Sequence, residues 1–79
     1  MRHELEIVYG LHPVLEMLRS GRHIGRLYLA LHKFNHQEDD EIRFLARQQR
    51  VSVVAVRKDE LSRIAGTTKH QGVAAMVFP

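Results

Sequence analysis

The segment GTTKHQG, residues 66–72, holds the densest group of side chains in this sequence that could bind a ligand. Its hydroxyl, ammonium, imidazole and amide groups can meet phosphates, base edges or sugar hydroxyls, and its last glycine would let a ligand approach the backbone. A solvated connection between a helix and a strand accounts for the same residues equally well. The candidate binding residues of this loop are Thr67, Thr68, Lys69, His70, Gln71 and Gly72.

A second candidate segment is YGLHP, residues 9–13, which contains Gly10 and His12. The glycine permits a sharp turn from a strand into a helix, and the N-terminus of that helix would offer unpaired N–H groups to an anion. On electrostatic grounds we add three basic residues near the ends of predicted elements, Arg22, Lys33 and Arg57. On charge alone, a role in solubility explains these bases better than ligand binding does.

The sequence offers little for catalysis or metal binding. It has no cysteine, which excludes disulfides, zinc–thiolate sites and thiol catalysis, and fits a reducing compartment. Among six histidines, His32 and His36 have a spacing that can share a metal, but no third ligand is placed beside them. No serine lies in a GxSxG segment, and there is neither a P-loop nor a GxGxxG motif. We therefore expect no catalytic residue, metal or cofactor in this chain.

The bulk properties favour one small soluble domain spanning residues 1–79. The net charge is +3, and the block EDDE at 38–41 holds four of the nine acidic residues, so the rest of the chain is strongly basic. No apolar run approaches the roughly 18 residues that a membrane span requires, and the N-terminus does not resemble a signal peptide. We expect a cytoplasmic domain without a membrane partner.

Hydrophobic periodicity predicts strands alternating with helices in the order β-α-β-α-β-α-β. Leu11, Val14, Leu15 and Leu18 fall on one helical face, and the apolar run at 26–31 is typical of a strand covered on both sides. This order predicts an α/β domain with a four-stranded sheet flanked by three helices, and leaves the strand order open. The predicted strands are 6–10, 26–31, 51–56 and 73–78, and the predicted helices are 12–20, 35–50 and 58–66.

Local signals set the ends of these helices. Asn35 and Glu38 form a capping-box pattern, and the acids at 38–41 crowd the first turn of the helix that follows, where its dipole favours negative charge. This gives the EDDE block a structural explanation in place of a metal site. Gly21 and Gly66 are natural terminators of the first and third helices.

Three segments, IVYGLHPVLEML, GRLYLA and HQGVAAMV, together resemble the N-terminal substrate-binding domain of SpoU/TrmH-type RNA 2′-O-ribose methyltransferases. The similarity extends from about Ile7 to Pro79 and is strongest to the branch that methylates a guanosine ribose in large-subunit ribosomal RNA. It implies an α/β domain like the ribosomal proteins of the L30e/L7Ae group. Gly10, His12, His70, Gln71 and Gly72 match the family pattern.

The resemblance implies an RNA-binding accessory domain that presents ribosomal RNA to a C-terminal methyltransferase domain. That domain would be knotted, would hold S-adenosylmethionine, and has no counterpart in this sequence, which lacks NxGxxxR and SLNVS-like segments. We therefore expect the chain alone to be no enzyme. Two alternatives stay open: a stand-alone L7Ae-like RNA-binding protein, and a protein-interaction or dimerisation module of the methyltransferase.

Overall fold

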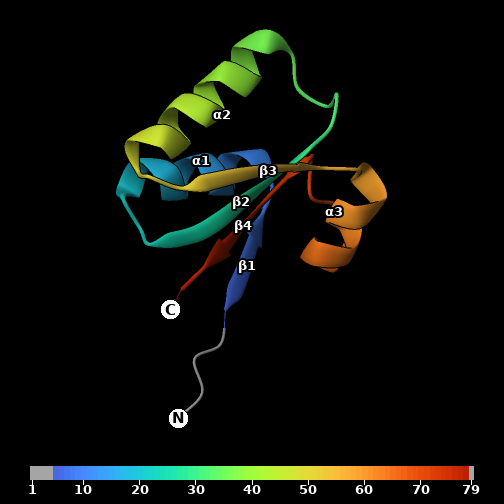
Figure 1. Ribbon diagram of the computed structural model, residues 1–79. Coiled ribbons are helices and arrows are strands. Elements are labelled where there is room, and N and C mark those ends of the chain that lie inside the picture. Colours follow the sequence, from blue (N-terminus) through green and yellow to red (C-terminus); the bar gives the residue numbers. More distant parts are fainter. Residues whose placement is uncertain (1–4, 79) are drawn as a thin grey trace.

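The computed structural model describes residues 5–78 and contains the seven predicted elements in the predicted order (Figure 1). Residues 1–4 and Pro79, the ends of the predicted 1–79 domain, lie outside the described residues. The elements are β1 (Glu6–Tyr9), α1 (Leu11–Ser20), β2 (Ile24–Ala30), α2 (His36–Gln48), β3 (Ser52–Val56), α3 (Lys58–Ala65) and β4 (Val73–Val77). The predicted α/β class, with one four-stranded sheet and three helices, is confirmed.

The sheet is mixed, with the strand order β1-β4-β2-β3. The last strand, β4, lies between β1 and β2 and runs antiparallel to both, whereas β2 and β3 are parallel. The strands β1, β2 and β3 therefore run in one direction and β4 runs in the other. Consequently the C-terminal ends of three strands and the N-terminal end of β4 share one edge of the sheet, which we call the loop end.

The helices form two layers around the sheet, with α1 and α2 on one face and α3 on the other (Figure 1). Alternate residues of β2 serve the two layers, because side chains of a strand alternate between faces. Leu27 and Leu29 pack in the core under α1 and α2, and Tyr28 packs with Leu61 of α3. This strand is covered on both faces, as its apolar sequence predicts, except at the exposed Arg26.

The caps of the helices confirm the local signals. The Asn35 side chain accepts a hydrogen bond from the Glu38 N–H at 2.8 Å, and the Glu38 carboxylate accepts one from the Asn35 N–H at 3.2 Å. Gly21 and Gly66 end α1 and α3 in the left-handed region, each with a φ of 73°. The acidic residues at the start of α2 thus complete a cap and complement the helix dipole.

The β2 strand begins at Ile24, two residues before its predicted start, because Gly25 does not interrupt it. A register irregularity against β4 lies between Ile24 and Arg26. A Cβ at position 25 would lie 2.8 Å from the Phe78 ring, so the absence of a side chain there makes room for that ring. The β2 strand therefore keeps its pairing with β4 through a residue that usually marks a strand boundary.

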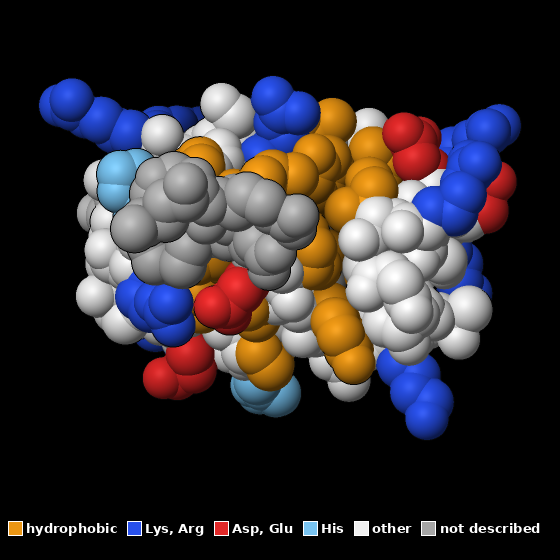
Figure 2. Space-filling model, turned by 90° about the horizontal axis from the view of Figure 1, so that it is seen from below, with side chains coloured by type: hydrophobic (Ala, Val, Ile, Leu, Met, Phe, Trp, Pro, Cys, Tyr) orange, Lys and Arg blue, Asp and Glu red, His pale blue; other side chains and the backbone are white. Residues whose placement is uncertain are grey.

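A band of hydrophobic side chains is exposed on the underside of the molecule, between basic side chains at its periphery (Figure 2). Leu5 and Phe78, which flank the outer ends of β1 and β4, are each 45% exposed. Ile7 and Met76 are paired across these two strands and are only partly buried. The short helix α3, with eight residues, contacts this face of the sheet without covering all of it.

Candidate nucleic-acid interface

Four connections meet at the loop end of the sheet: Gly10, residues 31–35, Arg57 and the loop 66–72. Their proximity is visible in backbone hydrogen bonds, since the Gly10 N–H donates to the Val73 carbonyl and the Ala30 N–H donates to the Gly72 carbonyl. Segments far apart in the sequence are therefore held side by side (Figure 1). The carboxyl edge of an α/β sheet is a common place for ligand sites, because loops there are positioned by a rigid scaffold.

The loop 66–72 ends in a tight turn. The Val73 N–H donates to the His70 carbonyl at 3.2 Å, and the two residues between them, Gln71 and Gly72, have φ values of 56° and 85°. Positive φ at both central residues is the pattern of a type I′ turn. Earlier in the loop, the Lys69 N–H donates to the Thr67 hydroxyl oxygen at 3.1 Å. The loop is thus an ordered structure built by its own polar groups.

His70 is the buried polar residue at the centre of this loop, with 2% of its surface exposed. Its Nδ1 accepts a hydrogen bond from the Gly72 N–H at 3.0 Å, and its Nε2 lies 3.0 Å from the Ser62 hydroxyl oxygen. The Ser62 hydroxyl donates to the Lys58 carbonyl, so its oxygen is left to accept from His70. We therefore assign the neutral tautomer with the proton on Nε2.

This geometry changes the task assigned to His70. We expected its ring to contact base edges or sugar hydroxyls, but both ring nitrogens have partners inside the protein and the ring is buried. The ring ties the turn at Gly72 to Ser62 of α3, so it positions the loop. We no longer include the His70 ring among the groups proposed to touch RNA.

The side chain of Gln71 caps the N-terminus of α1. Its side-chain oxygen accepts a hydrogen bond from the Leu11 N–H at 2.9 Å, and Pro13 contributes no N–H to the first turn. Of the N–H groups in the first turn of α1 that we expected to bind an anion, that of His12 is therefore the one that stays available. A Cβ at Gly10 would lie 3.3 Å from the same Gln71 oxygen, so the glycine leaves room for this cap.

The absence of a side chain at Gly72 makes room for Lys33 and Phe34. A Cβ at this position would overlap Cγ of Lys33 and would lie 3.2 Å from the Phe34 ring. The aliphatic stem of Lys33 thus crosses the backbone of the turn, while the residue as a whole is exposed. The Cβ position of Gly72 is therefore filled by Lys33, while Gly72 also lines the pocket described next, so the approach of a ligand to its backbone stays a prediction.

Lys33 and Gln71 stand between two neighbouring pockets. The first, of about 280 Å³, we call the lysine pocket; its polar lining includes His32, Lys33, Lys58, Thr68 and Gln71. The second, of about 350 Å³, is lined by Leu11, His12, Lys33, Phe34, Glu38 and Gln71. Two lysines, a threonine and a glutamine thus line one small hollow, and the donors that these residue types carry suit phosphate and ribose oxygens.

The remaining predicted residues are divided between the two ends of the sheet. Arg57 and Lys69 lie near the lysine pocket and are exposed; the Arg57 Nε is 3.7 Å from a carboxylate oxygen of Asp59. Arg22 does not join them. It follows α1 at the opposite end of the sheet, where it lines a hollow with Gln49 and Arg50.

Lys58 and His32 are pocket residues that the candidate list omits. Lys58 reaches the pocket because β3 pairs in parallel with β2, which aligns Val56 with Ala30 and brings the following residues together. The sequence contains no direct sign of this pairing. Had the parallel pairing of β2 and β3 been known, it would have predicted that Lys58 lies close to Lys33.

Other kinds of site find little support in residues 5–78. Within that range, no group of three or more histidine and acidic side chains is placed to hold a metal ion. None of the helices described there has the length and hydrophobicity needed to cross a membrane.

The mixed four-stranded sheet with two helices on one face and one on the other defines an α/β domain of the L30e/L7Ae type. Residues 7–79 match the family described as RNA 2′-O ribose methyltransferase substrate binding, and the chain belongs to this family. The family match covers nearly the same range as the resemblance of the three segments.

Similar proteins carry related descriptions. A protein of Mycolicibacterium vanbaalenii described as an uncharacterized tRNA/rRNA methyltransferase is 37% identical over 76 residues, covering 96% of this chain and 24% of the relative. Relatives with the same description from Mycobacterium avium and Mycobacterium tuberculosis are 37% and 34% identical over the same length. The chain spans about a quarter of the length of the curated relatives it matches.

Proposed function

We propose that this domain binds large-subunit ribosomal RNA at the lysine pocket and presents it to the methyltransferase domain of a longer protein. The observation that carries the proposal is that Lys33, from the connection after β2, and Lys58, at the start of α3, line one pocket beside Thr68 and Gln71 in a chain of the substrate-binding family. Ammonium groups bind phosphates, and hydroxyl and amide groups can meet the ribose 2′-OH that distinguishes RNA from DNA.

The mechanism in this proposal is delivery. A tethered domain that holds RNA raises the effective concentration of the target ribose at the catalytic domain and restricts its orientation. S-adenosylmethionine and the catalytic groups would belong to that second domain, and this chain would contribute no chemistry of its own. A cytoplasmic location is part of this proposal, and the absence of cysteine, which fits a reducing environment, supports it.

Anisotropy titrations of the domain with a labelled large-subunit rRNA fragment and a labelled tRNA test this proposal. We expect Lys33→Gln and Lys58→Gln each to weaken binding and to reduce the slope of log affinity against log salt by about 0.7–0.9, the value for one phosphate contact. The matched control is Arg63→Gln, which removes one charge from an exposed position of α3.

The outcomes separate the parts of the proposal. Tighter binding to rRNA than to tRNA supports the ribosomal substrate, and equal binding to both removes that assignment while leaving RNA binding intact. If the lysine variants behave like the Arg63→Gln control, the lysine pocket is not the binding site. A wild-type domain that binds neither RNA would refute the function as a whole.

The hydrophobic band on the underside favours a second candidate function, a contact with the methyltransferase domain or with another copy of this chain. Partly exposed apolar residues gather there on adjacent strands, as at many interaction surfaces: Leu5, Ile7, Met76 and Phe78. Sedimentation of the domain at increasing concentration tests the self-association form. A constant monomer mass would rule that form out, and a mass that rises with concentration and falls in Phe78→Ser would support it.

A further inference from the structure

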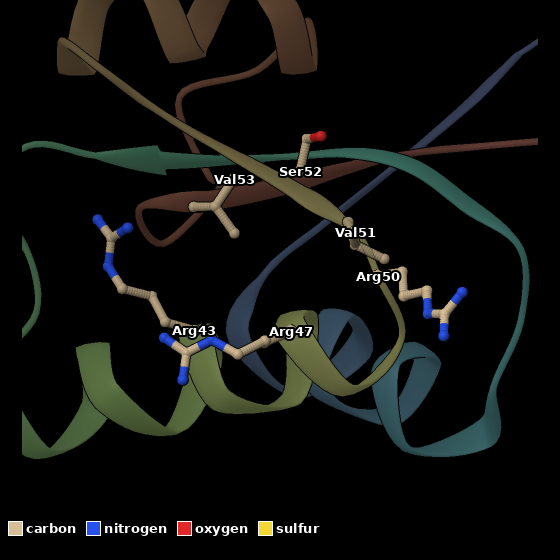
Figure 3. A pocket seen from close by; sticks show the side chains of 6 residues that line it. All are labelled: Arg43, Arg47, Arg50, Val51, Ser52 and Val53. Atoms are coloured by element: carbon tan, nitrogen blue, oxygen red, sulfur yellow. The ribbon is translucent and has the colours of Figure 1, made fainter.

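Three arginines line the open edge of the sheet, away from the lysine pocket (Figure 3). Arg43 and Arg47 extend from α2, and Arg50 follows the end of that helix; together with Val51, Ser52 and Val53 they line a hollow of about 450 Å³. The spacing of four residues places Arg43 and Arg47 on one side of α2, whereas Arg50 follows the end of the helix and its side chain extends away from the other two (Figure 3). We call this surface the arginine edge.

The strand beside these arginines has unpaired backbone groups. Among residues 5–78, the strand β3 lies at the edge of the sheet and pairs with β2 alone, and its Val56 carbonyl accepts a hydrogen bond from the Leu31 N–H on that side. Because successive residues of a strand direct their amide groups to alternate sides, Val53 and Ala55 direct theirs outward. An anion in the hollow could therefore meet backbone N–H donors as well as guanidinium groups.

Arg50 has a backbone conformation that usually belongs to glycine. Its φ is 58°, and the bonds from Arg50 N–H to the Arg47 carbonyl and from Val51 N–H to the Ala46 carbonyl form a Schellman motif. The other two helices end at glycines in the same left-handed region, Gly21 and Gly66. An arginine at this position is strained where glycine would not be, which points to a use for its side chain.

Acidic side chains neutralise only part of the positive charge of the arginine edge. Arg43 forms an ion pair with Asp39 at 2.8 Å. Of the ion pairs between residues 5 and 78, none involves Arg47 or Arg50. Charged residues can also protect an edge strand from pairing with other chains, but that protection does not require a strained arginine.

We propose that the arginine edge binds the sugar-phosphate backbone of the same RNA whose other part occupies the lysine pocket. This inference rests on the proposed function. Guanidinium groups bind phosphates in a two-pronged geometry, and β3 leads directly from Arg50 to Arg57 and Lys58 at the loop end. The strand of five residues is about 16 Å long, so one RNA segment can span both surfaces.

The test uses the same rRNA fragment, titrated over a range of salt concentrations. We expect Arg47→Gln and Arg50→Gln each to reduce the salt slope by about 0.7–0.9, and the double variant to reduce it by about twice as much. Arg50→Gly provides a sharper test, because glycine relieves the backbone strain. This variant should melt a few degrees higher, roughly 4 °C, and yet bind RNA more weakly.

The controls distinguish this inference from the proposed function. If Lys33→Gln weakens binding while the arginine-edge variants match Arg63→Gln, the lysine pocket stands and the arginine edge is refuted. If the wild-type domain does not bind the fragment, the proposed function fails, and this inference fails with it. Poly-glutamate is the competing ligand: if the arginine-edge variants lose its binding but keep RNA binding, the arginine edge serves an acidic peptide and our inference is wrong.

Discussion

Replacing His70 by alanine should destabilise the domain by about 2–4 kcal/mol, although residue 70 belongs to a polar loop. The substitution removes the acceptor of the buried Gly72 N–H, and an unsatisfied buried donor costs about 1–3 kcal/mol. The bond between Nε2 and Ser62 is lost as well, for about 1 kcal/mol. A domain of this length is stable by only about 4–12 kcal/mol, so the loss is a large share of the total.

Urea unfolding followed by circular dichroism measures this loss. With a slope of about 1 kcal/mol per molar urea, the unfolding midpoint of His70→Ala should fall by about 2 M or more. His70→Asn is the matched variant, because its side-chain oxygen can replace Nδ1 as the acceptor of the Gly72 N–H. It should recover a good part of the stability while still lacking the contact with Ser62.

Two results would contradict this reasoning. A change of less than about 0.5 kcal/mol in His70→Ala would place the residue among ordinary surface positions. Equal losses in the alanine and asparagine variants would show that the bond from Gly72 contributes little. Ser62→Ala supplies an internal check, since its effect should be smaller in the His70→Ala background than in the wild type.

Two further predictions concern the same turn. Gly72→Ala should cost about 2–3 kcal/mol of folding stability, because its φ is 85° and the new Cβ would overlap Lys33. Gly66→Ala should cost only about 1 kcal/mol, because its φ is 73° but no atom lies within 4 Å of the new Cβ. Thermal unfolding should separate the two variants by several degrees, and equal melting temperatures would exclude the packing explanation. Gln71→Glu keeps the oxygen that accepts the Leu11 N–H and adds negative charge at a helix N-terminus, so the melting temperature should not change. The same negative charge should repel RNA phosphates and lower RNA affinity. Unchanged affinity would remove residue 71 from the proposed interface.

Local signals made much of this fold predictable. The capping box at Asn35 and the glycines that end α1 and α3 act within a few residues, so they are legible without tertiary structure. The predicted end of the second helix was less accurate. The helix α2 ends at Gln48, two residues before its predicted end at residue 50. The reason is that Arg50 adopts the left-handed conformation, which is expected at glycine and was not anticipated at an arginine.

Long-range arrangement could not be predicted in the same way. Insertion of β4 between β1 and β2 depends on which strand edges bury the most apolar surface, and no short segment specifies that choice. The neighbouring positions of Lys33 and Lys58 follow from the parallel pairing of β2 with β3. The separation of Arg22 from the other candidates follows from the same topology. Arg22 precedes β2 and so lies at the opposite end of the sheet, whereas the other candidates lie in the connections at the loop end.

The segment HQG is one of the segments that carry the resemblance, and its residues make contacts that hold the loop end together. His70 is buried between Gly72 and Ser62, Gln71 caps α1, and Gly72 accommodates Lys33. Each of these tasks belongs to the folding of the loop end, so a match in this segment indicates a shared scaffold before it indicates a shared RNA. The choice among RNAs should then depend on exposed groups that the scaffold holds in place, above all the lysines of the lysine pocket and the guanidinium groups of the arginine edge. Exchanging those side chains for the corresponding ones of a relative, with HQG left intact, should therefore change RNA preference without changing stability.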